Sequence, residues 1–137
     1  MRIVADTGAI YALMDKDDRW HGRAKRVLKE EELELILPTT VLPEVCYLAN
    51  KYLGIRAELT FLKSILKGEI QIEELNISDY KSSIKYMEKY NDLNIGFVDA
   101  TIIAVAERLS IYNLFTTDRR HFSQVKTEKG KNFKLLP

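Results

Sequence analysis

The sequence predicts an α/β fold built on a parallel sheet with right-handed crossover connections. Two observations lead to this prediction. Short apolar runs that can form strands alternate along the chain with segments whose apolar residues recur at helical spacing. The first of these runs, Ile3–Ala5, has no polar interruption, which is typical of a strand buried on both faces in the middle of a parallel sheet.

The first half of the chain is predicted to contain two strands and four helices. Apolar residues at helical spacing indicate each helix. Pro38 ends the second strand, and Gly54 ends the third helix. After the first strand we expect helices at about 8–15 and 19–31, a strand at 33–37, a helix from Val41 to the stop at Gly54, and a helix at 56–66.

The second half begins with residues 69–73, whose alternating polar and apolar side chains predict a half-exposed strand at a sheet edge. The helix that follows is expected at 78–89, capped by Ser78 and with Ile84 and Met87 facing inward. The remaining expected elements are a loop at 90–97, a helix at 98–109, a strand at 113–115, a short helical turn at 119–122 and a strand at 133–136.

The composition is that of one globular domain spanning residues 1–137. Hydrophobic residues make up 46% and charged residues 30% of the chain. No apolar run approaches the ~20 residues that a membrane-spanning helix needs. Cys46 is the only cysteine, so an internal disulfide is excluded. Because the sequence shows no export signal, we expect a cytoplasmic protein.

Two basic segments stand out against a formal net charge of only +1. Residues 119–137 carry six lysines and arginines against one acid, Glu128, and a second group runs from Arg19 to Lys29. Clustered charge of this kind forms either an ordinary solvated surface or a phosphate-binding face. The charge pattern alone leaves both interpretations open.

Four carboxylates follow the predicted strands. Because helices that follow parallel strands start at the carboxyl edge of the sheet, residues at these junctions collect at one edge, where ligands bind in open α/β sheets. Asp6 ends the first strand, Glu44 lies in the first turn after the second strand, Asp99 opens the helix at 98–109, and Asp118 follows the strand at 113–115. Taken singly, each acid is also explained as a helix cap or as a favourable charge at a helix start.

Asp99 strengthens the case for a site. It shares a helical face with Ile102, Ile103 and Ala106, which should be buried. Buried carboxylates that repel one another persist only if a cation neutralises them. Oxygen ligands favour Mg²⁺ or Mn²⁺, and a carboxylate-held ion with open water positions is suited to phosphoryl chemistry.

Four stretches carry a resemblance to a known family. They are residues 4–13 (VADTGAIYAL), Pro43-Glu-Val45, residues 97–104 (FVDATIIA) and residues 116–122 (TTDRRHF). The chain resembles PIN-domain proteins, and more narrowly the VapC toxins of bacterial and archaeal toxin–antitoxin pairs. The resemblance covers nearly the whole chain, and the last stretch is its most specific part. Gly8 is a small departure, because many relatives have serine there.

The resemblance implies a fold and a function. The fold would be a PIN-like three-layer α/β/α domain, with a parallel sheet of about five strands and helices on both faces. The activity would be Mg²⁺- or Mn²⁺-dependent endoribonuclease cleavage, with Thr116 assisting through its hydroxyl. Its partners would be RNA, a cognate antitoxin and a second copy in a homodimer. The metal ligands, or their close support, would be Asp6, Glu44, Asp99 and Asp118.

Several residues stay open to two interpretations. Arg119 and Arg120 either pair with the acids or bind RNA phosphate. We expect His21 and His121 to be surface or local structural residues and assign His121 no catalytic role. Trp20 is expected in the core or an interface rather than as a base-stacking platform. Tyr47, Leu48, Tyr52, Leu59 and Leu62 give the helices at 41–53 and 56–66 a surplus of apolar surface for a dimer or an antitoxin.

Three other functions are compatible with a similar sheet. A PIN-like module that binds RNA or a protein without cutting should lack one of the four acids, and none is missing. A phospho-acceptor receiver domain needs two adjacent acids after the first strand, where Asp6 is preceded by Ala5. A haloacid-dehalogenase-type phosphatase needs Asp at position 8, which is Gly8.

Overall fold

A computed structural model describes residues 1–137 and contains one five-stranded sheet with the order β3-β2-β1-β4-β5. Every neighbouring pair in the sheet is parallel. The predicted strands are all present, with β1 in the middle and β3 at one edge as expected. Their bounds are β1 Arg2–Ala5, β2 Glu34–Pro38, β3 Ile70–Glu73, β4 Asn113–Phe115 and β5 Lys134–Leu136.

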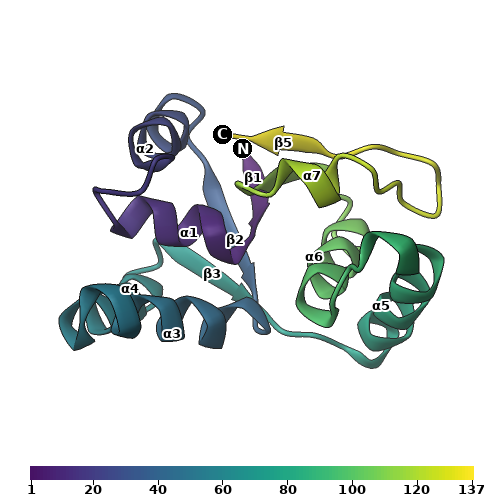
Figure 1. Cartoon of the computed structure of the whole chain (residues 1–137), viewed down its shortest axis with the longest axis horizontal. Coiled ribbons are helices and arrows are strands. Elements are labelled where there is room, and N and C mark those ends of the chain that lie inside the picture. Colours follow the sequence, from purple (N-terminus) through teal and green to yellow (C-terminus); the bar gives the residue numbers. More distant parts are fainter.

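Helices cover both faces of this sheet. In Figure 1, α1, α2, α3 and α4 lie on one side of the strands, and α5 and α6 lie on the other. The molecule is therefore the predicted three-layer α/β/α domain. The helices are α1 Thr7–Met14, α2 His21–Glu30, α3 Val41–Leu53, α4 Ile55–Leu66, α5 Ile77–Lys89, the 3₁₀ turn η1 Asn91–Leu93, α6 Phe97–Arg108 and α7 Arg119–Phe122. None of them is long and apolar enough to cross a bilayer.

The centre of the sheet forms the core. Val4 lies beside Ile36 of β2 and Leu114 of β4, and all three side chains are buried. The aliphatic run of β1 is thus covered on both faces, which is why it has no polar alternation. Among the helices, α6 supplies the largest buried stripe, which runs without interruption from Ala100 to Ala106.

The chain reverses its direction of travel across the sheet between β1 and β4. From β1 it moves outward through β2 to β3, and it then returns on the other face to β4, on the opposite flank of β1. Loops on the two sides of such a switch point diverge and leave a crevice at the carboxyl ends of the strands. The crevice here lies between the segments that follow β1 and β4.

Helix α5 differs from its prediction in two respects. It is capped by Asn76, not Ser78, in a reciprocal capping box with Asp79. The expectation that Ile84 faces inward is wrong, because its side chain is 55% exposed. Helix α5 instead buries Asp79, Ser83 and Tyr86.

Smaller differences concern the start of α6. The expected loop at 90–97 contains the short η1 turn, and α6 begins at Phe97 with Gly96 as its N-cap. Asp99 therefore lies in the first turn of α6, and no N-cap role accounts for it.

Candidate active site

Asp6 lies at the end of the central strand and is nearly buried, with 8% of its surface exposed. Its backbone N–H donates to the Phe115 carbonyl at 2.9 Å and so extends the contact between the β1 and β4 segments. One carboxylate oxygen accepts from the Thr7 N–H at 2.7 Å, which caps α1. The other oxygen accepts from the Thr116 hydroxyl at 2.9 Å. The carboxylate is thus held at the switch point from both sides.

Thr116 connects Asp6 to the second acid of the crevice. Its hydroxyl oxygen accepts from the backbone N–H of Asp118 at 2.9 Å while the hydroxyl donates to Asp6. Asp118 caps the short helix α7 by accepting from the His121 N–H at 3.1 Å. The second Asp118 oxygen lies 2.8 Å from Nδ1 of His121.

Asp99 approaches this group from α6, on the other face of the sheet. Asp99, Asp118 and His121 each offer a ligand atom, and these three atoms lie within 4.8 Å of one another. All three residues are partly buried. His121 therefore belongs to the cluster. Its segment is polar, and for that reason the sequence predicted a surface or local structural role for His121 and no catalytic one.

Glu44 completes the set from α3 and is the most exposed of the four acids. Its Oε1 accepts from the Thr7 hydroxyl at 2.6 Å. Because the backbone N–H of Thr7 also donates to Asp6, Thr7 alone links Glu44 to Asp6. All four predicted acids thus lie at the carboxyl edge of the sheet, with Glu44 at the border of the group.

The carboxylates perturb one another. The pKa of Asp6 is raised to about 7, first because burial disfavours the charged form and then because Asp99 and Asp118 add negative charge. Burial also raises the pKa of Asp99, and the charges of Asp118 and Glu44 raise it further while His121 lowers it. No arginine or lysine forms an ion pair with any of the four acids.

The two arginines beside Asp118 form no ion pair with the acids. The guanidinium of Arg119 donates to the carbonyl oxygen of Pro137 and lies 5.8 Å from the ring centroid of Trp20. Arg120 is exposed. Pairing of these arginines with the acids, one of the two interpretations, is therefore absent from the structure.

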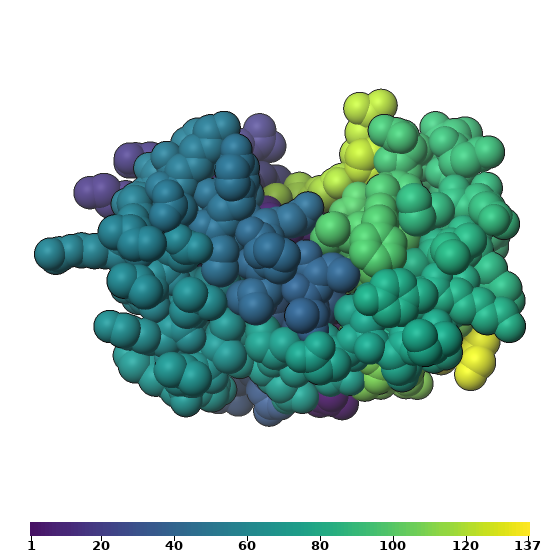
Figure 2. All heavy atoms as spheres, turned by 90° about the horizontal axis from the view of Figure 1, so that it is seen from below, coloured from purple at the N-terminus to yellow at the C-terminus, as the bar shows by residue number.

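Two recesses flank the acids. One, of about 410 Å³, is lined by Thr7, Pro43, Glu44, Tyr47 and Leu48. The other, of about 470 Å³, is lined by residues of the η1 segment and of α7, including Asn94, Arg120 and His121. Figure 2 shows the surface hollowed between the α3 side, in blue, and the α6 side, in green. A chain-like ligand crossing the acids would have space on both sides.

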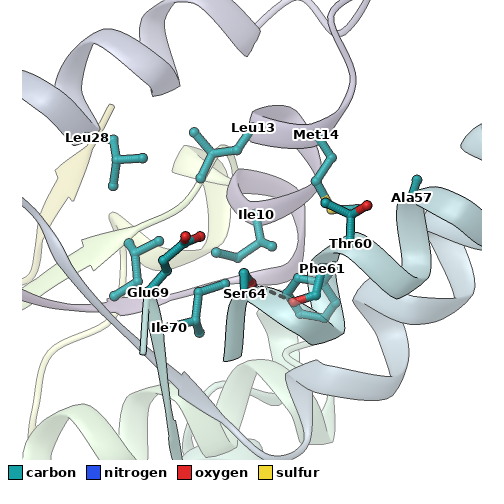
Figure 3. Close-up of a pocket in the computed structure, with 11 residues that line it drawn as sticks. Ile10, Leu13, Met14, Leu28, Ala57, Thr60, Phe61, Ser64, Glu69 and Ile70 are labelled. Carbon is teal, nitrogen blue, oxygen red and sulfur yellow. Dashed lines mark hydrogen bonds between the residues drawn. The ribbon is translucent and has the colours of Figure 1, made fainter. Parts of the chain in front are cut away.

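A third pocket, of about 470 Å³, is apolar and lies away from the acids (Figure 3). Leu35 and Ile70 place it near the amino-terminal ends of β2 and β3, the opposite edge of the sheet. Ile10, Leu13 and Phe61 of α1 and α4 point into it. Its lining is mostly apolar, and Thr60, Ser64 and Glu69 are its polar members.

The acid cluster fits a divalent cation. Carboxylate oxygens supply most of the possible ligand atoms, with one imidazole nitrogen from His121. Such oxygen-rich sets suit hard ions. A cation would also relieve the repulsion that raises the pKa of Asp6 and Asp99.

Comparison with known proteins agrees with this architecture. The family model described as the PIN domain matches residues 3–128. The chain belongs to the PIN-domain family. It is 27% identical over 135 residues to Ribonuclease VapC26 of Mycobacterium tuberculosis, covering 98% of this chain and 100% of that relative. The PIN-domain resemblance noted from the sequence is thereby confirmed, and this PIN domain is homologous to VapC ribonucleases.

Solved structures carry the same fold. The crystal structure of M. tuberculosis VapC20, described as a sarcin-ricin loop cleaving toxin, superposes with a TM-score of 0.79 at 25% identity, covering 86% of this PIN domain and 91% of that chain. A toxin–antitoxin complex from Klebsiella pneumoniae superposes with a TM-score of 0.71 at 20% identity, covering 90% and 92% of the two chains. The second likeness concerns the fold alone.

Proposed function

We propose that this PIN-domain protein is a metal-dependent endoribonuclease and the toxin of a type II toxin–antitoxin pair. Homology to proteins named as ribonucleases supports the reaction class. The observation that carries the proposal is the meeting of Asp6, Asp99 and Asp118 at the β1–β4 switch point with no arginine or lysine paired to them. This is an arrangement that an RNA-cleaving metal site requires and that helix capping alone does not explain.

Asp6, Asp99 and Asp118 would hold the cation, Mg²⁺ or Mn²⁺, with Glu44 as a fourth ligand or close support. Such an ion, when bound, activates water and stabilises charge on the attacked phosphate. The surrounding residues position these acids. Thr116 holds Asp6 and the backbone of Asp118 in one orientation through its single hydroxyl.

His121 is positioned by Asp118. Because Nδ1 of the imidazole contacts the Asp118 carboxylate at 2.8 Å, the ring orientation is set and Nε2 remains for a second partner. The adjoining recess is lined by His121 and Arg120, so a phosphate or leaving oxygen in that recess would meet two polar donors. We assign these residues to substrate positioning.

Partners of this PIN domain would be RNA, an antitoxin and a second copy of the chain. VapC20 is named as specific for 23S rRNA, so a sarcin-ricin loop hairpin is the first structured RNA to test. The similar fold from Klebsiella pneumoniae was solved as a toxin–antitoxin complex, which supports an antitoxin partner. The cytoplasmic setting stays a prediction.

The test compares wild type with Asp99→Asn and Asp6→Asn on a mixed RNA pool and on the hairpin. Each RNA is incubated with Mg²⁺, with Mn²⁺ and with EDTA. Asparagine caps helices about as well as aspartate, so the Asp6 variant should keep α1 while losing the charge. We expect metal-dependent cutting by wild type and at least a hundredfold loss in both variants, with thermal melts confirming that they are folded.

Two outcomes would contradict the proposal. If wild type binds RNA but does not cut it in the presence of any of the metals, the protein is a binding module, the alternative that the sequence left open. If folded Asn variants cut as fast as wild type, the acids act only in capping and local structure, and cleavage has another origin.

A further inference from the structure

Trp20, at the start of α2, is surrounded by three guanidinium groups. The guanidinium carbons of Arg19, Arg23 and Arg119 lie 5.4, 5.5 and 5.8 Å from the centroid of the indole ring. Trp20 itself is partly buried, and the three arginines are exposed. We call these four residues the Trp20–arginine surface.

This surface joins the two basic segments of the sequence. Arg19 and Arg23 belong to the group around α2, whereas Arg119 opens the basic stretch that follows β4. About one hundred residues separate the two segments in the chain, and tertiary packing brings their side chains to one ring. Clustering across the fold is a stronger sign of a phosphate-binding face than charge within either segment.

The surface adjoins the acid cluster. Arg119 directly follows Asp118 in sequence, and its side chain is tied to the Pro137 carbonyl, at the end of β5. It therefore extends from the carboxyl edge of the sheet toward α2. An RNA strand that places a phosphate at the acids can continue onto these cations within a few nucleotides.

No side-chain carboxylate neutralises the charges of this surface. None of the three arginines forms an ion pair with an aspartate or glutamate, and Arg119 donates only to the Pro137 carbonyl oxygen. One cation over a tryptophan is stabilising, but three guanidinium groups around a single ring repel one another. An anion bound between them relieves that repulsion, and the indole beneath offers a face for a base.

We propose that the Trp20–arginine surface binds the phosphodiester backbone of single-stranded RNA next to the cleavage site, with a base against the indole of Trp20. The inference rests on the proposed function in one respect, namely that RNA is the substrate. It assigns RNA-binding roles to Arg19, Arg23 and Trp20, and it gives Arg119 a role in holding substrate.

Trp20 is the only tryptophan of the chain, so its fluorescence reports on this surface alone. The full chain is titrated in EDTA with a mixed-sequence single-stranded RNA of about twelve nucleotides, so that binding is measured without cleavage. We expect a saturable change in Trp20 fluorescence. Arg19→Gln and Arg23→Gln should each weaken binding about threefold to tenfold and lower the salt slope by about 0.7, the value for one phosphate contact on a single strand.

Arg56→Gln, on exposed α4, is the matched control, because it removes the same charge away from Trp20 and should leave the affinity and the slope unchanged. Thermal melts establish that all variants are folded. A label on the RNA, read by anisotropy, measures binding independently of the tryptophan.

The inference is overturned if RNA binds by anisotropy without changing Trp20 fluorescence, and equally if Arg19→Gln and Arg23→Gln bind like Arg56→Gln. It is also overturned if a glutamate-rich peptide shifts Trp20 fluorescence and RNA does not, since the surface would then serve a protein partner. Cleavage with metal is assayed separately. If wild type cuts RNA but shows no change in Trp20 fluorescence, the inference fails and the proposed nuclease function stands. If RNA binds at Trp20 but is not cut, the proposed nuclease function fails and the RNA-binding surface stands.

Discussion

The carboxyl group of Asp6 links the chemistry of the site to stability. Its pKa of about 7 in the folded chain lies above the ordinary value of 3.8, so the folded state holds a proton that the unfolded state releases. The stabilisation from that proton is complete below about pH 4 and is lost as the pH rises toward 7. Ionising Asp6 in the folded, metal-free protein therefore opposes folding.

Because the pKa of Asp6 is raised in the folded state, the stability of the protein should depend on pH. Without divalent metal, we expect Asp6→Asn to become more stable relative to wild type as the pH rises from 4 to 7.5, by up to about 4 kcal/mol. Adding Mg²⁺ at pH 7.5 should stabilise wild type and not the variant. Denaturant unfolding at several pH values measures the difference. A difference that stays constant with pH would mean that Asp6 is ionised throughout.

Gly8 illustrates how a single side chain is accommodated near the site. A Cβ atom at this position would lie 2.6 Å from Oγ1 of Thr117, which is too close for either atom to stay in place. The departure from serine noted in the sequence therefore concerns space as much as a missing hydroxyl. Thr117 occupies the volume that a larger residue at position 8 would need.

We expect Gly8→Ser alone to destabilise the protein and Thr117→Ala to relieve that effect. The coupling between the two substitutions should be about 1 kcal/mol, within the range for residues in contact. A double-mutant cycle of thermal or denaturant unfolding measures it. If the effects of the two substitutions on the free energy of unfolding are additive, the Thr117 side chain rotates away from position 8 without cost.

At the scale of elements, Arg108 joins three parts of the chain on the far side of the sheet. Its Nε donates to both oxygens of Asp79 at 3.0 and 3.1 Å, and Nη1 donates to Glu73 at 3.0 Å. Nη2 donates to the Glu74 carbonyl at 3.1 Å. The end of α6 is thus tied to the capping box of α5 and to the end of β3. Asp79 is 2% exposed and depends on this partner.

Arg108→Gln should destabilise the protein by about 3 kcal/mol, because it leaves the buried Asp79 charge without its partner. Arg108→Lys should recover only part of the loss, since an ammonium cannot reproduce the fork of donors. The control is Lys85→Gln, at an exposed position of α5. Equal stability of Arg108→Gln and the control would mean that Asp79 is hydrated or protonated without cost.

The same ion pair explains the one helix face that the sequence analysis assigned wrongly. Helical spacing identifies residues that share a face, and an apolar face is then assumed to be buried. In α5 the buried stripe contains Asp79 and Ser83, because their polar groups are satisfied by Arg108 and by the helix backbone. Ile84 is left on the exposed side. Local pattern cannot reveal a partner that lies on another helix.

At the scale of the whole molecule, exposed apolar side chains gather on two surfaces. One lies on α3 and α4 and includes Tyr52, Ile55 and Leu59, which are 60%, 57% and 46% exposed. The other lies on α5 and the start of α6, where Tyr80 stacks on Phe97 at 5.9 Å between ring centroids. Apolar patches of this kind mark contact sites for other chains.

We expect the protein to form a homodimer, with the α3–α4 surface at the contact or available to the antitoxin. Light scattering coupled to size-exclusion chromatography should give twice the mass of 15.9 kDa. Leu59→Glu places a charge on the α3–α4 surface, and we expect it to yield a monomer that melts within a few degrees of wild type. If wild type is monomeric at all concentrations, the homodimer prediction is wrong. If the Leu59→Glu variant is still a dimer, the dimer contact lies outside the α3–α4 surface.

The amino-acid pattern alone predicted how strands and helices alternate along the chain and where each acid follows a strand. An acid that follows a parallel strand must lie near the carboxyl edge, because all strands share one direction, and this rule uses only local pattern. Asp6 and Asp118 also serve as helix caps, so their local roles were visible as well. The division into one domain over residues 1–137 remains a prediction of the sequence.

Which of these side chains meet depends on how the elements pack against one another in three dimensions. His121 joins Asp99 because α6 and α7 approach the same crevice from different parts of the chain. Arg119 turns from the acids to Trp20 and Pro137. Hydrophobic spacing specifies which face of an element is buried, but distances between side chains on different elements arise from packing across the whole core. The acids could therefore be placed at one edge from sequence, while their neighbours could not.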